Sequence, residues 1–184
     1  MDYVLDEKGN KCTFLDGELH SYDDKPALIY TSNDQYWYKN GKIHRDNDLP
    51  AVIFIGGIQY WYQNNKIHRE NDLPAIIYAN GNQYWYKNGK KHRDNDLPAI
   101  IYANGDQVWY QNGKIHRDNG LPAIICTNGD QFWYKFDMRH RVTKDGSFPG
   151  PAVILANGHA EWWINDKKVE EYENYRPKIK SARN

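Results

Sequence analysis

A unit of 24 residues recurs along most of the chain, and this repetition limits the folds that are available to it. The same step separates the members of three sets: the histidines His20, His44, His68, His92, His116 and His140; the tryptophans Trp37, Trp61, Trp85, Trp109 and Trp133; and the prolines Pro26, Pro50, Pro74, Pro98 and Pro122. A fixed period of this size is typical of repeat proteins, in which each unit packs on its neighbours. We therefore expect one elongated array and not a globular domain.

Each copy carries two turn signals between short segments of β-type residues. Asn80-Gly81 and Asn88-Gly89 both offer the two positive-φ residues of a type I′ hairpin turn. The segments 83–86 and 99–102 are too short for helices and rich in aromatic and β-branched residues. The sequence therefore predicts an all-β fold: an elongated, single-layer antiparallel β-meander of about two bent strands per repeat, capped at both ends.

A third signal is the sequence Asp-Asn-Asp-Leu-Pro at 94–98 and at equivalent positions. Proline has no N–H to donate to a strand ladder, so we expect Pro98 and its equivalents at a kink that divides a long strand into two arms. The flanking aspartates are expected to accept hydrogen bonds from nearby backbone N–H groups in Asx-type turns.

Deviations from the repeat divide the chain into four expected parts. Residues 1–19 form a degenerate N-terminal capping repeat, and residues 20–141 are regular repeats. Residues 142–169 are a last, divergent repeat with an insertion, and residues 170–184 are a C-terminal cap with a basic tail. Atypical residues at both ends are expected because a terminal repeat has one face without a neighbour.

Charge and hydropathy exclude several classes of partner. Lys and Arg together number 24, as do Asp and Glu, and a neutral chain lacks the basic surface that a nucleic-acid partner requires. No apolar run approaches the roughly 18 residues of a membrane span. The N-terminus shows no signal peptide, so we expect an intracellular protein. Cys12 and Cys126 lie at different phases of the repeat, which argues against a disulfide.

The unit that begins Tyr84-x-Trp-Tyr-x-Asn-Gly-Lys-x-His, with the later turn Asn104-Gly105-Asp106, resembles the MORN repeat. It is closest to the divergent variant found in large DNA viruses and bacteriophages, and the resemblance covers nearly the whole chain. It departs from the family after the histidine, where 92–98 replaces His-Gly-x-Gly. The resemblance implies a scaffold or protein-interaction module that often self-associates, so a protein partner or a homodimer is expected. Lipid-headgroup binding is attributed to some members. A viral origin would place the chain in the host cytoplasm or the virion.

Alternation along a strand puts Gln83, Trp85 and Lys87 on one face and Tyr84 and Tyr86 on the other. The tryptophan row is interpreted as core packing or as part of an exposed groove for a partner. The second row varies among copies, which suits a partly exposed face that contacts a partner. The partner-binding candidates are therefore Tyr36, Tyr60, Tyr84, Val108 and Phe132, together with Trp37, Trp61, Trp85, Trp109 and Trp133.

Other recurring residues are interpreted as structural: His44, His68, His92, His116, Pro50, Pro74, Pro98, Pro122, Asp48, Asp72 and Asp96. Each imidazole is expected to bond a backbone carbonyl or an Asp of the adjacent repeat, and Arg93 is expected to join an ion-pair ladder. No metal and no cofactor are predicted. Successive histidines are one repeat apart, too far to share an ion, and the Asp-rich loop lacks the Gly and Glu of a calcium loop.

Catalysis is disfavoured because the same His and Asp recur in every copy, whereas an active site is one constellation in one pocket. The sequence predicts a non-enzymatic scaffold that mediates protein–protein interaction or self-assembly through an aromatic sheet face. The alternative is an array of equivalent sites between repeats that hold small ligands or lipid headgroups. A scaffold should bind a protein or another copy of the chain. An array of ligand sites should bind several ligand equivalents per chain.

Overall fold

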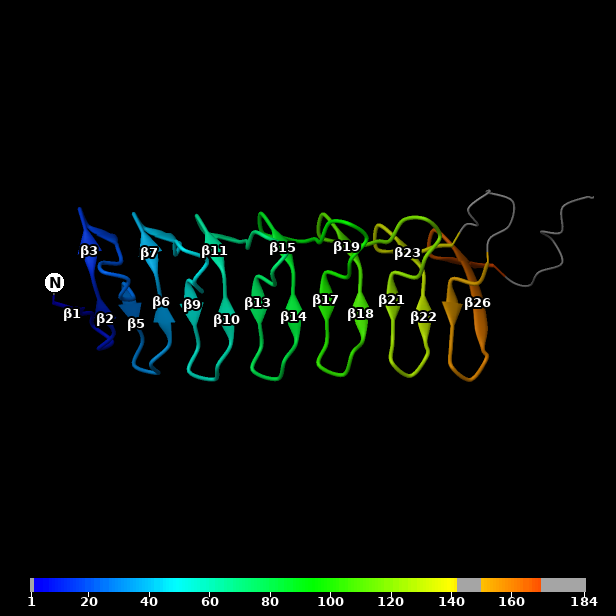
Figure 1. Ribbon diagram of the computed structural model, residues 1–184, viewed down its shortest axis with the longest axis horizontal. Coiled ribbons are helices and arrows are strands. Elements are labelled where there is room, and N and C mark those ends of the chain that lie inside the picture. The colour runs from blue at the N-terminus through cyan, green and yellow to red at the C-terminus, as the bar shows by residue number, and fades with distance from the viewer. Residues whose placement is uncertain (1, 142–149, 170–184) are drawn as a thin grey trace, which may run out of the picture.

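The computed structural model describes residues 2–141 and 150–169, which form strands, turns and connections without a helix (Figure 1). The repeats stand side by side along one axis, and the all-β meander predicted from the sequence is confirmed. The predicted insertion at 142–149 and the cap and tail at 170–184 lie outside the described residues. None of the described segments is a helix that could cross a membrane.

One open sheet of fifteen strands runs the length of the molecule and is called the main sheet here. Each strand pairs antiparallel with the next one in the order given. The strands are β1 (Val4–Leu5), β2 (Lys11–Cys12), β5 (Leu28–Ile29), β6 (Gln35–Tyr36), β9 (Val52–Ile53), β10 (Gln59–Tyr60), β13 (Ile76–Ile77), β14 (Gln83–Tyr84), β17 (Ile100–Ile101), β18 (Gln107–Val108), β21 (Ile124–Ile125), β22 (Gln131–Phe132), β25 (Val153–Ile154), β26 (Ala160–Ile164) and β27 (Lys167–Val169).

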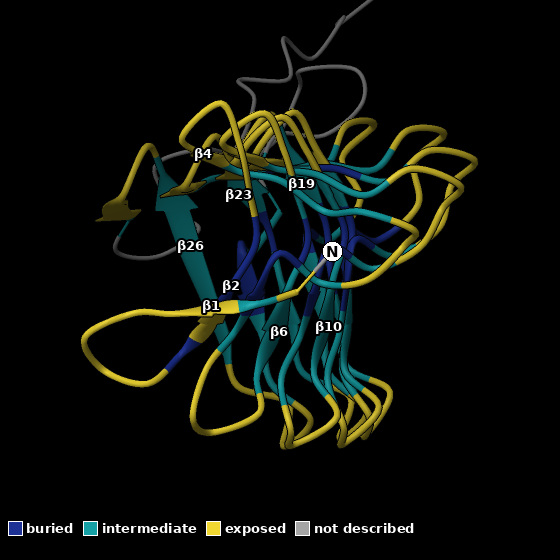
Figure 2. Ribbon diagram, turned by 90° about the vertical axis from the view of Figure 1, so that its left-hand side faces the viewer, coloured by how far each residue is buried: buried dark blue, intermediate teal, exposed yellow. Residues whose placement is uncertain are grey.

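Six short hairpins, called the arms, branch from one end of the main-sheet strands (Figures 1 and 2). Each arm pairs two strands of one repeat. The pairs are β3 (Phe14–Leu15) with β4 (Glu18–Leu19), β7 (Tyr38–Lys39) with β8 (Lys42–Ile43), β11 (Tyr62–Gln63) with β12 (Lys66–Ile67), β15 (Tyr86–Lys87) with β16 (Lys90–Lys91), β19 (Tyr110–Gln111) with β20 (Lys114–Ile115), and β23 (Tyr134–Lys135) with β24 (Met138–Arg139).

The bend between main sheet and arm lies at the tryptophan, whereas the sequence predicted a kink at the proline. β14 and β15 are interrupted only at Trp85, whose N–H donates to Ala99 O of the next repeat at 2.8 Å. Its own carbonyl accepts from His92 N, in the same repeat, at 3.2 Å. The strand therefore changes its hydrogen-bonding partner at this residue, from the neighbouring repeat to its own arm.

The proline lies in a loop between two strands, so the predicted kink within one long strand is wrong. Residues 92–99 belong to no strand and form a loop between β16 and β17, with Pro98 near its end. Its missing N–H is harmless there, because no ladder continues through the loop. The return path is still divided into two parts, as the sequence predicted, but by a loop.

The two Asn-Gly turns differ, although the sequence predicts type I′ for both. In the arm turn Asn88 and Gly89 both have positive φ, 52° and 81°, as type I′ requires. In the main-sheet turn only Gly81 has positive φ, 90°, and it donates to Tyr78 O while Tyr78 N donates to Asn82 O. This pattern is a type I turn closed by a left-handed glycine, which is one residue longer.

The core follows the bend and extends onto the main sheet, where Leu28, Val52, Ile76, Ile100 and Val153 are 2–8% exposed. The alanines at the start of each main-sheet strand pair are fully buried: Ala27, Ala51, Ala75, Ala99, Ala123 and Ala152. The tryptophans Trp37, Trp61, Trp85, Trp109 and Trp133 are only 4–6% exposed. In the first unit Thr13 replaces the tryptophan and keeps its backbone bonds, to Ala27 O and from His20 N. Burial between neighbouring repeats therefore stabilises the array.

We predict that Gly105→Ala destabilises the chain more than Gly158→Ala. Both residues have a left-handed backbone, with φ of 92° and 86°, so either alanine should cost about 1 kcal/mol in strain. A Cβ at Gly105 would lie 2.9 Å from Thr127 Cγ2, whereas a Cβ at Gly158 meets nothing within 4 Å. Thermal unfolding should show a melting temperature several degrees lower for Gly105→Ala. Equal melting temperatures would contradict the close approach of the turns.

Candidate functional site

Two surfaces of the array present chemistry in every repeat: the junction between repeats beside the tryptophans, and the side of the main sheet that carries the tyrosines. The junction contains the histidines, arginines and aspartates that the sequence singled out as structural. The second surface contains the variable row, from Tyr36 to Phe132.

At each junction an arginine covers a tryptophan and binds an aspartate of the preceding repeat. The Arg93 guanidinium lies 3.9 Å from the Trp85 ring centroid, a cation–π contact. Its Nε and Nη2 donate to both carboxylate oxygens of Asp72, at 2.7 and 2.8 Å. The carbonyl of Asp72 accepts from the Trp85 indole N–H at 2.9 Å. One aspartate thus fixes both side chains of the next repeat.

The same arrangement recurs along the array, and the ion-pair ladder predicted for Arg93 is confirmed. The sets are Asp24, Trp37 and Arg45; Asp48, Trp61 and Arg69; Asp72, Trp85 and Arg93; and Asp96, Trp109 and Arg117. The Asx-turn role predicted for Asp48, Asp72 and Asp96 is wrong, because their carboxylates bind arginine instead of nearby backbone N–H groups.

His44, His68 and His92 each link two repeats through their two ring nitrogens. His92 Nε2 lies 2.9 Å from Asp94 Oδ1 of its own repeat, and Nδ1 accepts from Asn112 N of the next repeat at 3.2 Å. The prediction of a carbonyl or neighbouring-repeat Asp as the partner is therefore wrong in detail. The carboxylate is local, and the link between repeats runs through a backbone N–H. A histidine that is only 14% exposed and held on both sides is a structural residue.

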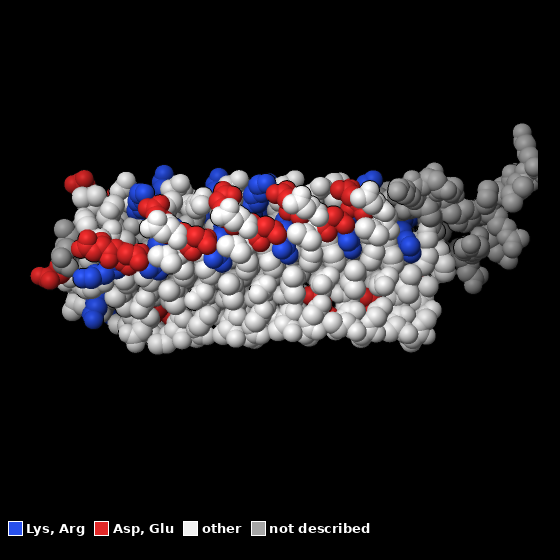
Figure 3. Space-filling view, in the orientation of Figure 1, with Lys and Arg blue, Asp and Glu red and all other residues white. Residues whose placement is uncertain are grey.

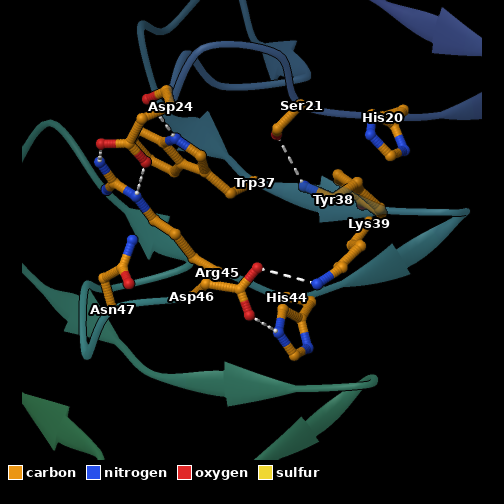
Figure 4. Close-up of a pocket in the computed structure, with 10 residues that line it drawn as sticks. All are labelled: His20, Ser21, Asp24, Trp37, Tyr38, Lys39, His44, Arg45, Asp46 and Asn47. Carbon is orange, nitrogen blue, oxygen red and sulfur yellow. Dashed lines mark hydrogen bonds and ion pairs between the residues drawn. The ribbon is translucent and has the colours of Figure 1, made fainter.

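The junctions contain open cavities of about 130–380 Å³ in five places. Figure 4 shows one of them, where Arg45 reaches Asp24 beside Trp37 and where Asp46 joins Lys39 to His44. The pKa of Asp46 is lowered because Lys39 and His44 donate to it, and the pKa of Asp24 is lowered by the hydrogen bonds from Arg45. The cationic groups here are already bound to carboxylates. Among the described residues no cluster of His, Cys, Asp and Glu could hold a metal ion.

One junction lacks both side-chain links. Gly120 stands where the aspartate belongs, so Arg141, stacked 3.8 Å from Trp133, bonds only Pro151 O among the described residues. Burial lowers the pKa of Arg141. Phe136 replaces the asparagine, and its ring stacks on His116 with centroids 4.0 Å apart. The Nδ1 of His116, which would accept the bond to the next repeat, has no partner within the described chain.

The other surface is a continuous row of aromatic rings, called the tyrosine face here. Neighbouring ring centroids are 5.2–6.5 Å apart from Tyr30 to Tyr102, mostly in edge or tilted geometry. The row runs Tyr30, Tyr36, Phe54, Tyr60, Tyr78, Tyr84, Tyr102, and Tyr38, Tyr62, Tyr86 and Tyr110 border it at the arms. It ends where Val108 and Cys126 replace aromatic residues.

The predicted partner-binding residues separate into two groups. Tyr36, Tyr60, Tyr84 and Phe132 are half-buried, and Val108 is 7% exposed. The tryptophans are 4–6% exposed and lie beneath arginines, so the core interpretation of that row agrees with the structure. Sequence reasoning missed the contribution of Tyr30, Phe54, Tyr78 and Tyr102, although their spacing from the buried strand residues would have placed them on the same face.

Comparisons of the sequence with protein-family models and with curated proteins found no match. The similarity to MORN repeats stays a prediction from the residues.

We predict that Gly120→Asp stabilises the chain by about 0.5 kcal/mol, because it places a carboxylate beside Arg141, which bonds only Pro151 O among the described residues. The backbone accepts this residue, since Gly120 has φ of 67° and the equivalent Asp72 and Asp96 have 55° and 54°. Gly120→Asn is the matched control, with the same backbone tolerance and no charge. Urea unfolding should give Gly120→Asp a higher free energy of unfolding than Gly120→Asn at low salt, and the difference should vanish at high salt. Equal stability of the two variants would contradict an ionic link.

We predict that Asp72→Asn lowers the free energy of unfolding at pH 7 and that the deficit disappears in acid. Hydrogen bonds from Arg93 lower the pKa of Asp72 in the folded state. Stability from such a group is complete above its unfolded pKa, near 4, and is lost as the pH falls through the lower folded value. Because the side chain is 47% exposed, the deficit should be about 0.5 kcal/mol. Urea unfolding of both proteins between pH 7 and 3 tests this, and a constant difference would refute it.

Proposed function

We propose that this chain is a non-enzymatic scaffold that binds an extended segment of a partner protein along the tyrosine face. The observation that carries the proposal is the unbroken row of half-exposed aromatic rings from Tyr30 to Tyr102. Tyrosine is enriched in protein interfaces because it offers a large contact area and one polar group on a side chain with few rotatable bonds.

The hydroxyl groups of this face are suited to recognising a polypeptide backbone. Burial raises the pKa of Tyr84 to about 12 and also raises the pKa of Tyr36 and Tyr60, so these groups stay protonated at neutral pH. A protonated phenol both donates and accepts a hydrogen bond, as the N–H and C=O groups of an extended chain require. The rings supply apolar contact beside each hydroxyl.

The backbone holds the face ready before a partner arrives. Tyr36, Tyr60 and Tyr84 sit on strands that pair on both sides, as Tyr84 does with Ile76 and Ile100. The other rings of the row each follow directly after a strand, as Tyr78 follows β13. Ring-to-ring contacts restrict the side chains further. A preorganised face loses little conformational freedom on binding, which favours affinity.

The alternative function, an array of small-ligand or lipid-headgroup sites, is supported by the cavities that recur at successive junctions. Their arginines already bind carboxylates, so an anionic ligand would have to displace an ion pair in each one. We therefore favour the tyrosine face.

We predict that Tyr60→Ser with Tyr84→Ser weakens partner binding at least tenfold while the fold is retained, because these rings lie at the centre of the row. Proteins from a lysate of the source organism that bind the immobilised wild-type chain would be identified and their affinities measured against the variant. Tyr22→Ser is the control, since Tyr22 contacts His20 outside the tyrosine face. Undiminished binding by the double variant, or its unfolding, would refute the proposal.

A further inference from the structure

The opposite side of the main sheet carries a second ordered row, called the Ile/Gln face here. Strand register places one isoleucine and one glutamine of each repeat side by side, as in the pairing of Gln83 with both Ile77 and Ile101. The row runs Ile29, Gln35, Ile53, Gln59, Ile77, Gln83, Ile101, Gln107, Ile125, Gln131, Ile154. It therefore crosses eleven adjacent strands without interruption.

This face is uncharged, half-exposed and shallow. All its residues are intermediate in burial. Gln83 points to the same side as Trp85, on which Arg93 stacks. Figure 3 shows a row of Lys and Arg side chains on the side turned to the viewer. The sheet surface below that row is almost free of charged side chains (Figure 3). Towards the turns the next positions are mostly small, such as Gly81 beside Ala103, and the exposed Ile55 is the large side chain among them.

The composition of this face does not vary among the repeats. Every isoleucine position holds Ile and every glutamine position holds Gln, while the tyrosine face contains Tyr, Val and Phe at one equivalent position. The five glutamine amides have no side-chain hydrogen bond to the part of the chain that the structure describes. These amides are therefore available to a molecule that covers the face, together with half-exposed isoleucines.

The spacing of the row identifies the occupant. Equivalent residues recur every two strands, about 9.6 Å. Seven residues of an α-helix rise about 10.5 Å, so a helical partner would be out of step by about 4 Å after five repeats. Two residues of an extended strand rise about 6.8 Å, which fits no better. The Ile/Gln face of a second copy has the same period, and because it is uncharged the two faces do not repel each other.

We propose that two copies of this chain pair through their Ile/Gln faces. The two-fold axis lies in the interface and runs along the array, so that Ile faces Ile and Gln faces Gln over the whole row. In this arrangement the two arrays run in the same direction, and the strands of one copy point opposite to those of the other. In the alternative, with the two arrays antiparallel, the exposed loops at 46–49 and equivalent positions of both copies would meet at the same edge, which disfavours it.

In this two-fold arrangement the exposed leucines of those loops are also covered by the other copy. Leu49, Leu73, Leu97 and Leu121 are 37–40% exposed, one in each repeat. The loops of one copy overhang the small residues at the turns of the other, such as Ala79 and Ala103. Apolar loop tips therefore meet an apolar, shallow edge.

The area is sufficient for a stable dimer. Eleven strands at about 4.8 Å give a row of about 48 Å. The Ile or Gln position and the small position beside it on the same side take four residues of each strand, which adds a width of about 14 Å. The face then covers about 700 Å² per copy, close to the roughly 800 Å² per partner of specific interfaces. Pairing of the two faces leaves both tyrosine faces exposed, so the dimer and the proposed partner do not compete.

The test is the molar mass in solution, measured by light scattering and sedimentation between about 1 and 100 µM. The wild-type chain should reach the mass of two 21.7-kDa copies. A variant with Gln59→Lys, Gln83→Lys and Gln107→Lys should stay monomeric throughout, a weakening of dimerisation of at least 100-fold, because six like charges would face one another. Lys11 already occupies the equivalent position opposite Ile29, so the backbone accepts lysine there.

The matched control is Gln63→Lys with Gln111→Lys on the arms, where the equivalent repeats carry Lys39, Lys87 and Lys135. This control should dimerise as the wild type does, and circular dichroism should show that all variants are folded. The Tyr60→Ser and Tyr84→Ser variant should also dimerise, which separates this proposal from the partner-binding function. A monomeric wild-type chain at about 100 µM, or a dimer that persists in the triple lysine variant, would overturn the proposal.

Discussion

The change of hydrogen-bonding partner at each tryptophan is the constraint on which the rest of the structure depends. Trp85 N–H bonds the next repeat and Trp85 C=O bonds its own arm, so one residue both joins neighbours and turns the chain. At this bend a bulky side chain fills the space between main sheet and arm, and a small side chain of the next repeat lies beside it. Trp85 is 6% exposed and Ala99 is fully buried at this place. The backbone bonds and the packing therefore require the same spacing, and the repeat of 24 residues preserves both.

The bend also separates two chemically different sides of the same sheet. Alternation along a strand sends Tyr84 to one side and Gln83 to the other, and pairing in register extends each residue into a row. The arginine, aspartate and histidine side chains are used at the junctions between repeats. Charges are thus concentrated near the bend, and the broad face of the main sheet that Figure 3 shows is left for neutral contacts.

Much of the architecture could be predicted from the sequence because it follows from local rules. The arm turn at Asn88-Gly89 and the antiparallel meander needed only turn preferences and strand periodicity. The carboxylate of Asp72 was assigned to the wrong partner because its arginine is 21 residues away, beyond any local pattern. The Asn80-Gly81 turn was mistaken for type I′ because the dipeptide alone does not reveal the loop length. The tryptophan row was left ambiguous because strand alternation does not say which face is covered.

The junction at Gly120 and Phe136 has a consequence for how the array comes apart. Every regular junction before it has an ionic link and an imidazole link across it, whereas among the described residues this one has neither. It keeps backbone pairing, the stacking of Phe136 on His116, and the indole bond from Trp133 to Gly120 O. Its other side-chain links are hydrogen bonds from Ile115 N to Asp137 and from Thr127 to Asp106. In a linear array each unit is stabilised mainly by its neighbours, so the weakest junction sets the boundary between cooperative units. Amide exchange should accordingly divide the molecule there, with the units from Trp133 onwards exchanging as one block while the long stretch before Gly120 stays closed.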